Sequence, residues 1–237
     1  MSKHLQSDLE RLRRDLFHLS SLVVHSMDKA ILALMSWHRA IADEVIEEDD
    51  EIDRREVEIE ENCLKLLALH QPVAGDLRFI ITAMKVNNDL ERMGDMAVNI
   101  AERVVSLSAF DRPESDLDFR ALTADVGKMV QMSLDALADN DTEKAYSVIA
   151  MDDIVDDATR SMFDSLLVGM KKDAGSIERS IHLLSASRHL ERIADLATNI
   201  AQDVVYMVSG ELIRHRSAGS QQPAAENQER NAGGVQR

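Results

Sequence analysis

Apolar residues recur at alternating spacings of three and four along most of the chain, the pattern of amphipathic helices. Between residues 73 and 108 one such stripe has seven members: Val86, Leu90, Met93, Ala97, Ile100, Val104 and Leu107. The spacing predicts one helix from about Val73 to Ser108, about 54 Å long at 1.5 Å per residue. No segment combines strict two-residue alternation with β-branched residues, so the pattern predicts no strands.

Helix-breaking residues are scarce and grouped, which predicts long helices. The chain has three prolines, and none of them lies between residues 114 and 209. Proline, glycine and asparagine mark the ends of helices. The expected breaks fall near Ala40, Pro72, Pro113, Asn140 and Gly175. We therefore expect an all-α fold built from elongated helical bundles.

The chain contains an internal repeat. The segments 90–105 and 190–205 are identical at ten of sixteen positions, and the alignment continues upstream with a three-residue shift at an expected turn. Two copies of one unit of about 100 residues are the signature of a tandem architecture. Each unit fits three helices, so we expect two tandem three-helix bundles, at residues 1–112 and 113–215. Residues 216–237 lack apolar periodicity, and we expect a disordered tail there.

Charge and cysteine content narrow the function classes. The chain has 43 acidic and 27 basic residues, a net charge of −16, which argues against nucleic-acid binding. The single cysteine, Cys63, excludes an internal disulfide and a Cys-cluster zinc site, and we expect it to be a small core residue. The first ten residues lack an apolar signal segment, and no apolar run approaches the ~20 residues of a membrane span. We expect a cytoplasmic protein that meets a membrane only through protein partners.

Acidic residues recur at four-residue spacing in both copies of the repeat. Residues four apart lie on one face of a helix, where two like charges repel by a few tenths of a kcal/mol. A cation between them would reverse the sign of that interaction. The repeated pairs are Asp49 with Asp53 and Glu91 with Asp95 in the first copy, and Asp152 with Asp156 and Glu191 with Asp195 in the second.

These pairs are predicted to lie level with one another across each helical hairpin. Residues of two antiparallel helices are level when their numbers share one sum. In the first copy 49 + 95 and 53 + 91 both equal 144, and half of 144 is Pro72, the expected turn. In the second copy both sums are 347, centred on the expected turn near Gly175. Each hairpin would thus present four carboxylates at one height.

Four level carboxylates predict a metal centre in each copy, because hard cations take several oxygen ligands. Asn99 and Asn199 follow one turn later and extend the two candidate ligand sets. Glu56 and Asp50 are weaker extensions. The alternative is a solvated acidic face, which is common in a chain with 30% charged residues. The carboxylates by themselves do not select one metal.

Other catalytic signatures are missing from the sequence. No Glu-x-x-His occurs, which counts against a ferritin-like oxidase, and no glycine-rich phosphate loop or nucleophile elbow is present. The eight histidines follow no metal-binding spacing. We therefore expect a protein that is not an enzyme. The alternatives are a metal-dependent phosphohydrolase, because two-metal sites catalyse phosphoryl transfer, and a metal-free helical scaffold.

The motifs resemble those of the PhoU family of phosphate-signalling proteins over roughly residues 3 to 215. The matching segments are Leu-Glu-Arg-Met-Gly-Asp at 90–95 and Leu-Glu-Arg-Ile-Ala-Asp at 190–195, each followed by Asn-Ile-Ala. Gln71-Pro72, Asp76-Leu77-Arg78 and the segment from Tyr206 to His215 match as well. The resemblance implies two tandem three-helix bundles and negative regulation of the phosphate-starvation response and of phosphate uptake.

The resemblance also implies partners and cofactors. The expected partners are the ATPase of a phosphate ABC transporter and a sensor histidine kinase, between which the protein would act as an adaptor. It implies multinuclear iron or zinc clusters on the repeated carboxylates. Elongated bundles with exposed apolar stripes often pair, so we expect a homodimer. The second copy has Thr159 in place of Glu56 and Ala194 in place of Gly94, so we expect its cluster to be smaller or weaker.

Overall fold

The computed structural model describes residues 3–111 and 119–213. Within these ranges the chain forms seven α-helices and one short 3₁₀ helix, and no strand, which confirms the all-α prediction. The helices are α1 (Lys3–Ser36), α2 (Arg39–His70), α3 (Ala74–Leu107), α4 (Phe119–Asp139), α5 (Thr142–Ile149), α6 (Asp152–Lys172), the 3₁₀ helix η1 (Ala174–Ser176) and α7 (Ile177–Ser209).

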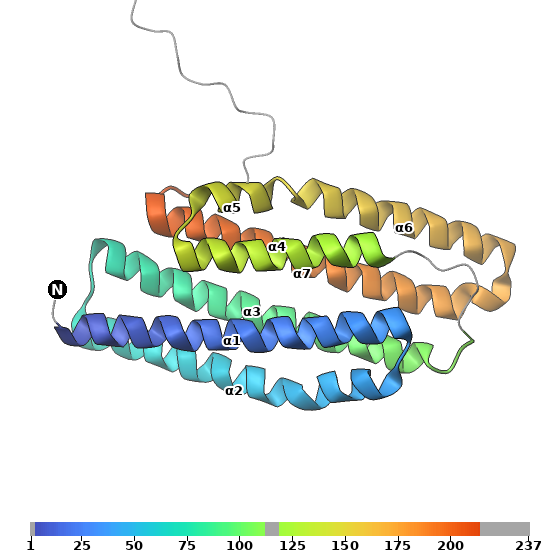
Figure 1. The fold of residues 1–237 in the computed structure, drawn as a ribbon, viewed down its shortest axis with the longest axis horizontal. Helices are drawn as coiled ribbons and strands as arrows, with labels where there is room; N and C mark the ends of the chain where they lie inside the picture. Colours follow the sequence, from blue (N-terminus) through green and yellow to red (C-terminus); the bar gives the residue numbers. More distant parts are fainter. Residues whose placement is uncertain (1–2, 112–118, 214–237) are drawn as a thin grey trace, which may run out of the picture.

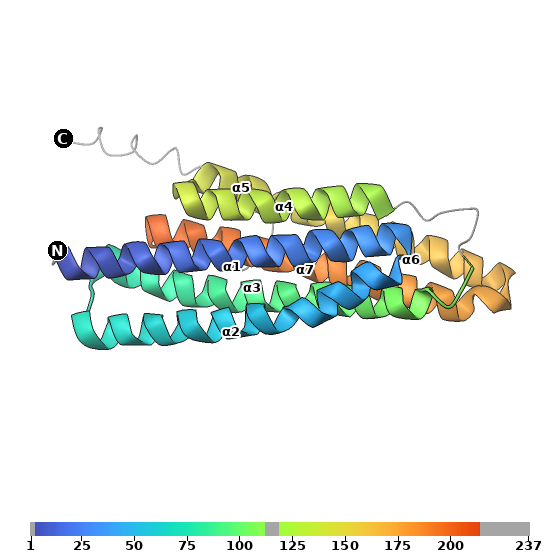
Figure 2. The same cartoon turned by 60° about the horizontal axis from the view of Figure 1, so that its bottom comes forward.

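The helices form two bundles that lie side by side. Helices α1, α2 and α3 make the first bundle, and α4 to α7 make the second (Figure 1). The third helix of the first bundle, α3, packs along α7, the last helix of the second. In Figure 1, α2 and α6 run along opposite edges of this α3–α7 pair, and Figure 2 shows α1 and α4 together on one side of it. The two internal copies therefore meet through their most similar helices.

Most helix ends match the expected breaks. Helix α2 ends where Gln71 adopts a left-handed conformation (φ 45°), its N–H donates to the carbonyl of Leu67, and Pro72 follows. Asn140, also with positive φ, separates α4 from α5. The predicted helix from Val73 to Ser108 is confirmed within one residue at each end. The predicted break at Pro113 and the predicted tail at 216–237 lie outside the described residues.

The second bundle differs from expectation in its middle helix. The first bundle has one continuous helix, α2, at this place, whereas the second has α5 and α6, separated at Ala150 and Met151. The helix breaks without proline or glycine, so no residue at this point predicted it. As a consequence Asp152 begins a helix, whereas its counterpart Asp49 lies inside one.

The predicted apolar stripe of α3 forms the centre of the first bundle. All seven of its members are fully buried. Helix α1 contributes leucines, valine and alanines at spacings of three and four to the same core. By length and composition α1 would also suffice to cross a membrane, and 44% of its most apolar stretch is buried. Core helices of soluble proteins meet the same criterion, so we assign α1 to the core.

Polar contacts join the two bundles at one end of the α3–α7 pair. The ammonium of Lys85 lies 2.8 Å from the carboxylate of Asp203 and 5.2 Å from the ring centre of Tyr206. Asp203 is buried, so this pair is shielded from solvent more than a surface pair. Arg78 Nε donates to the carbonyl of Met207 at 3.1 Å. The aligned positions of Lys85 and Asp203 in the other copy are a serine and an arginine, so the contact is not repeated.

Helices α2 and α3 approach each other closely at Gly94. A Cβ atom at this position would lie 3.3 Å from both Cδ1 and Cγ2 of Ile52 and 3.6 Å from Oδ1 of Asp49. In the second copy the aligned residues are Ala194 and Val155, both buried. In the first copy the larger Ile52 is thus combined with glycine, and in the second the smaller Val155 is combined with alanine. This exchange of volume keeps the two hairpins similarly packed.

The contact between Gly94 and Ile52 predicts that substitutions at these two positions have non-additive effects on the free energy of unfolding. Gly94→Ala gains helix propensity of about 1 kcal/mol, but it overpacks a buried β-branched side chain that cannot rotate away, at about 1–3 kcal/mol. We expect a net loss of about 1 kcal/mol in the free energy of unfolding by urea denaturation. Ile52→Val combined with Gly94→Ala should cost less than the sum of the two single changes. Strict additivity of the two changes would contradict this account.

Candidate metal centres

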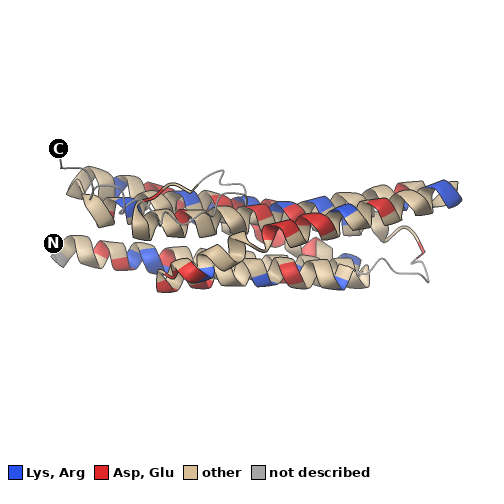
Figure 3. Ribbon diagram, turned by 90° about the horizontal axis from the view of Figure 1, so that it is seen from above, with Lys and Arg blue, Asp and Glu red and all other residues tan. Residues whose placement is uncertain are grey.

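The structure brings the four predicted carboxylates of the first copy together across the α2–α3 hairpin. Asp49 experiences repulsion from Asp53 on its own helix and from Asp95 across the hairpin. Glu91 is repelled by Asp95 and by Asp53. Those cross-hairpin pairs are the level pairs predicted from the shared sum. In Figure 3 acidic positions gather near the middle of the molecule, in the layer opposite the N-terminus.

The environment of this cluster disfavours negative charge. Burial, followed by the repulsion of Asp53 and Asp95, raises the pKa of Asp49 to about 6. Burial first and neighbouring carboxylates second also raise the pKa values of Glu91, Asp95 and Glu56. Oδ1 of Asp49 is buried and has no hydrogen-bond partner among the described residues. Such an oxygen is stabilised by a proton or by a cation.

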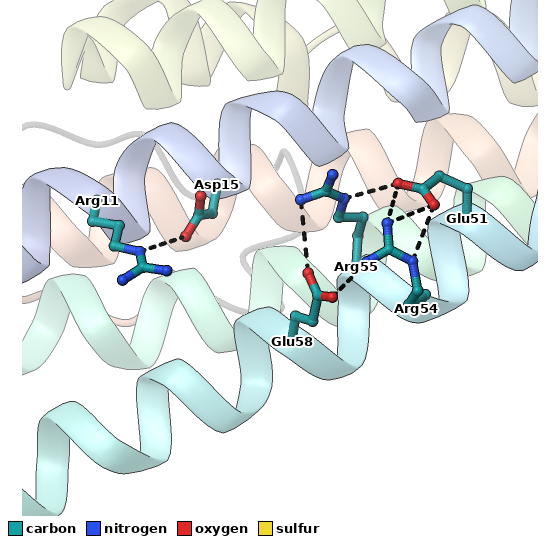
Figure 4. Close-up of polar contacts among 6 residues, drawn as sticks. All are labelled: Arg11, Asp15, Glu51, Arg54, Arg55 and Glu58. Atoms are coloured by element: carbon teal, nitrogen blue, oxygen red, sulfur yellow. Dashed lines mark hydrogen bonds and ion pairs between the residues drawn. The ribbon is translucent and has the colours of Figure 1, made fainter.

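Nearby acidic residues on the outer face of α2 are in a different situation. Glu51 accepts hydrogen bonds from Arg54 and Arg55, with Nε–oxygen distances of 3.1 and 2.9 Å (Figure 4). These bonds lower the pKa of Glu51 to about 2. In contrast, no described lysine or arginine lies within 4.0 Å of the carboxylates of the first cluster. The solvated-face alternative therefore fits Glu51, whereas the buried, unpaired oxygen of Asp49 fits a cation site.

The second copy forms a similar cluster across the α6–α7 hairpin. Burial, then repulsion by Asp152, Asp156 and Glu191, raises the pKa of Asp195 to about 6. Burial and repulsion by Asp156 raise the pKa of Glu191 as well. As in the first copy, the carboxylates predicted to lie level repel each other: Asp152 repels Asp195, and Asp156 repels Glu191.

Neighbouring hydroxyl and guanidinium groups stabilise the carboxylates of the second cluster more than those of the first. The hydroxyl of Thr198 donates to Oδ1 of Asp152 at 3.0 Å and opposes the upward shift of its pKa. Arg188, Arg192 and Arg160 partly offset the charge of Glu191.

These partners were not predicted from the sequence. In the first copy the positions aligned with Thr198, Arg160 and Arg188 hold valine, valine and asparagine. These three differences between the copies are visible in the sequence, but which carboxylate each side chain meets depends on the packing of α6 against α7.

The two asparagines of the predicted ligand sets point to other contacts. Nδ2 of Asn99 donates to the main-chain oxygen of Asp95 at 2.8 Å. Asn199 lines a groove between α3 and α7. Their role as metal ligands therefore stays a prediction. Cys63 is buried, and burial raises the pKa of its thiol to about 12, as suits a core residue.

The donor chemistry fits a metal ion, although the side chains are spread. Both clusters offer carboxylate oxygens, which suit hard cations. Within residues 3–111 and 119–213, no three His, Cys, Asp or Glu side chains surround a single point closely enough to hold one ion. Like charges without a cation between them repel. Chelation would therefore require these carboxylates to turn toward one another, and the unpaired oxygen of Asp49 would gain a partner.

The raised pKa of Asp49 predicts how stability depends on pH. A carboxyl whose folded pKa (about 6) exceeds its unfolded value (3.8) destabilises the fold when ionised. This penalty is complete above pH 6 and disappears as the pH falls toward 3.8. Chelator-treated protein should be more stable at about pH 5 than at about pH 7.5, and Asp49→Asn should remove about 1 kcal/mol of that difference in urea denaturation. An unchanged difference in Asp49→Asn would contradict the assignment.

Comparisons with known proteins agree with this architecture. A sequence model of the family described as PhoU domain matches residues 16–104 and 119–204. A Pseudomonas aeruginosa protein named phosphate-specific transport system accessory protein PhoU homolog is 38% identical over 216 residues, which cover 91% of this chain and 89% of that protein. The Aquifex aeolicus protein of the same name is 38% identical over 212 residues, 90% of this chain and 96% of its own length.

Solved structures give the same result. The crystal structure of PhoU from Pseudomonas aeruginosa superposes with a TM-score of 0.84 at 38% identity, over 87% of this chain and 99% of that one. The phosphate transport system regulatory protein PhoU from Streptococcus pneumoniae gives a TM-score of 0.82 at 32% identity, over 88% and 99% of the two chains. Two matches to the family, one per repeat, and these superpositions show that the chain belongs to the PhoU family.

Proposed function

We propose that this protein is an accessory protein of phosphate transport that acts as a non-catalytic negative regulator of phosphate uptake and of the phosphate-starvation response. Relatives with about 38% identity are named phosphate-specific transport system accessory proteins. It would act in the cytoplasm as an adaptor between the ATPase of a phosphate ABC transporter and a sensor histidine kinase. A homodimer would present two copies of each candidate metal centre.

The observation that carries the proposal is the pair of carboxylate clusters. Each cluster holds four acidic side chains on two packed helices, and burial and repulsion raise the pKa values of several of them. We infer that metal ions, iron or zinc, bind there as clusters and rigidify the surface that the partners contact. Within residues 3–111 and 119–213 we assign no separate base or nucleophile beside the proposed ligands, so we infer a structural role for these metals.

We further infer that the first cluster binds metal more tightly than the second. The first has an unpaired buried carboxylate oxygen on Asp49 and adjoins Glu56. In the second, Thr198 already occupies an oxygen of Asp152 and three arginines offset Glu191. A bound cation competes with such partners, because each of them stabilises the metal-free carboxylate.

Calorimetric titration with Mn²⁺ and with Zn²⁺ tests this order. In chelator-treated protein we expect Asp53→Asn with Asp95→Asn to weaken the tighter binding event at least about tenfold. Asp156→Asn with Asp195→Asn should affect only the weaker event. Glu61→Gln with Asp164→Asn, an exposed pair outside both clusters, is the matched control. Equal effects of the control and of the first pair would refute the ligand assignment.

A deletion strain grown in ample phosphate tests the regulatory role. Loss of a negative regulator should raise alkaline phosphatase activity, and the native gene should restore it to a low level. Complementation with Glu91→Ala and Asp95→Ala then shows whether the carboxylates contribute to repression. Low activity in the deletion strain would contradict phosphate-linked repression. Hydrolysis of phosphate esters by metal-loaded protein, lost in the same variant, would favour a phosphohydrolase instead.

A further inference from the structure

A groove of about 620 Å³ lies between α3 and α7, where the two bundles meet. Six of its seven lining residues carry polar side chains, although it lies at the junction of two hydrophobic cores. The lining residues are Met84, Lys85, Asn88 and Asp89 of α3, with Asn199, Gln202 and Asp203 of α7. The groove therefore presents side chains from both bundles to one bound molecule.

Three amide side chains of this groove are free to bind a ligand. Asn88, Asn199 and Gln202 form no hydrogen bond with any described residue, and both asparagines are exposed. Each amide carries one acceptor oxygen and one NH₂ donor group. A row of such groups matches the alternating N–H and C=O groups of an extended polypeptide main chain.

The surroundings of the groove are negatively charged. Its lining has two carboxylates and one ammonium, and Lys85 and Asp203 are paired with each other. Asn88 precedes Glu91 by one helical turn, and Asn199 follows Asp195 by one turn. Residues three or four apart share a helix face. The groove thus continues toward both carboxylate clusters, in a chain of net charge −16.

We propose that this groove binds an extended, positively charged segment of a partner protein. The amides of Asn88, Asn199 and Gln202 hydrogen-bond its main chain, and its lysine or arginine side chains lie toward the adjoining carboxylates. The residues of α3 that line the groove span about 7.5 Å, the length of about two extended residues. The segment held by amides is therefore short, and charge attraction beyond the groove supplies part of the affinity.

The charge selects this occupant over other macromolecules. Nucleic acids and anionic membrane surfaces are repelled by the same carboxylates. The inference rests on the proposed adaptor function only in assuming a protein partner, and it adds the chemistry of the contact. It can fail while metal binding and repression hold, because the test below uses chelator-treated protein and no cells.

Fluorescence anisotropy with labelled peptides tests the proposal. The probe is a peptide of about ten residues in which lysine or arginine alternates with alanine or threonine, since alternate residues of an extended chain share one face. We expect it to bind the full chain. A peptide of the same sequence with N-methylated main-chain nitrogens should bind about tenfold more weakly, because it cannot donate to the amides. A peptide with glutamate in place of the basic residues should not bind.

Matched variants locate the contact. Asn88→Ala with Gln202→Ala should weaken binding of the basic peptide about tenfold. Asn62→Ala with Gln131→Ala, amides on α2 and α4 outside the groove, should leave it unchanged. Asn199 is kept because it belongs to the predicted metal ligands. Unchanged affinity in the groove variant, equal binding of the N-methylated peptide, or no binding of the basic peptide to the native chain would overturn the proposal.

Discussion

The repulsion between carboxylates held on packed helices is the constraint on which this account depends. Helix packing at the α2–α3 and α6–α7 hairpins fixes the backbone, so the acidic side chains cannot separate by more than their own rotation allows. Burial is the larger cause and repulsion adds to it, so that the pKa of Asp49 and that of Asp195 rise to about 6. Burial of the apolar stripes stabilises the fold enough to hold these mutually repelling carboxylates in place. Such locally unfavourable arrangements are typical of binding sites.

Much of the fold and of the candidate sites could be predicted from sequence, for physical reasons. The stripe from Val86 to Leu107 has one period throughout, and nothing but a buried helix satisfies it. The level pairing of Asp49 with Asp95 could be predicted because it follows from antiparallel geometry and the position of Pro72. In the structure the two carboxylates lie close enough to repel each other. The break at Ala150 has no proline or glycine, and pairings such as Thr198 with Asp152 depend on tertiary contacts.

Differences between the two copies indicate a division of roles within one architecture. The first hairpin combines Gly94, which admits close approach of α2, with the unpaired Asp49 oxygen. The second has a split middle helix and carboxylates that already have partners. Between them, the Lys85–Asp203 contact beside the groove joins the bundles at one end, and a hydrogen bond from Arg179 to the main-chain oxygen of Asp111 joins them at the other. The two copies thus share the bundle architecture and differ in the side chains that meet between the helices.

Anomalous diffraction from crystals of the full chain grown with Mn²⁺ tests the central claim most directly. Our account predicts anomalous density between α2 and α3, within ligand distance of Asp49, Asp53, Glu91 and Asp95. It also predicts density of lower occupancy between α6 and α7. The carboxylates should have turned inward relative to the metal-free arrangement. Density absent from both hairpins, or confined to other surfaces, would contradict the claim that the repeated carboxylates are metal centres.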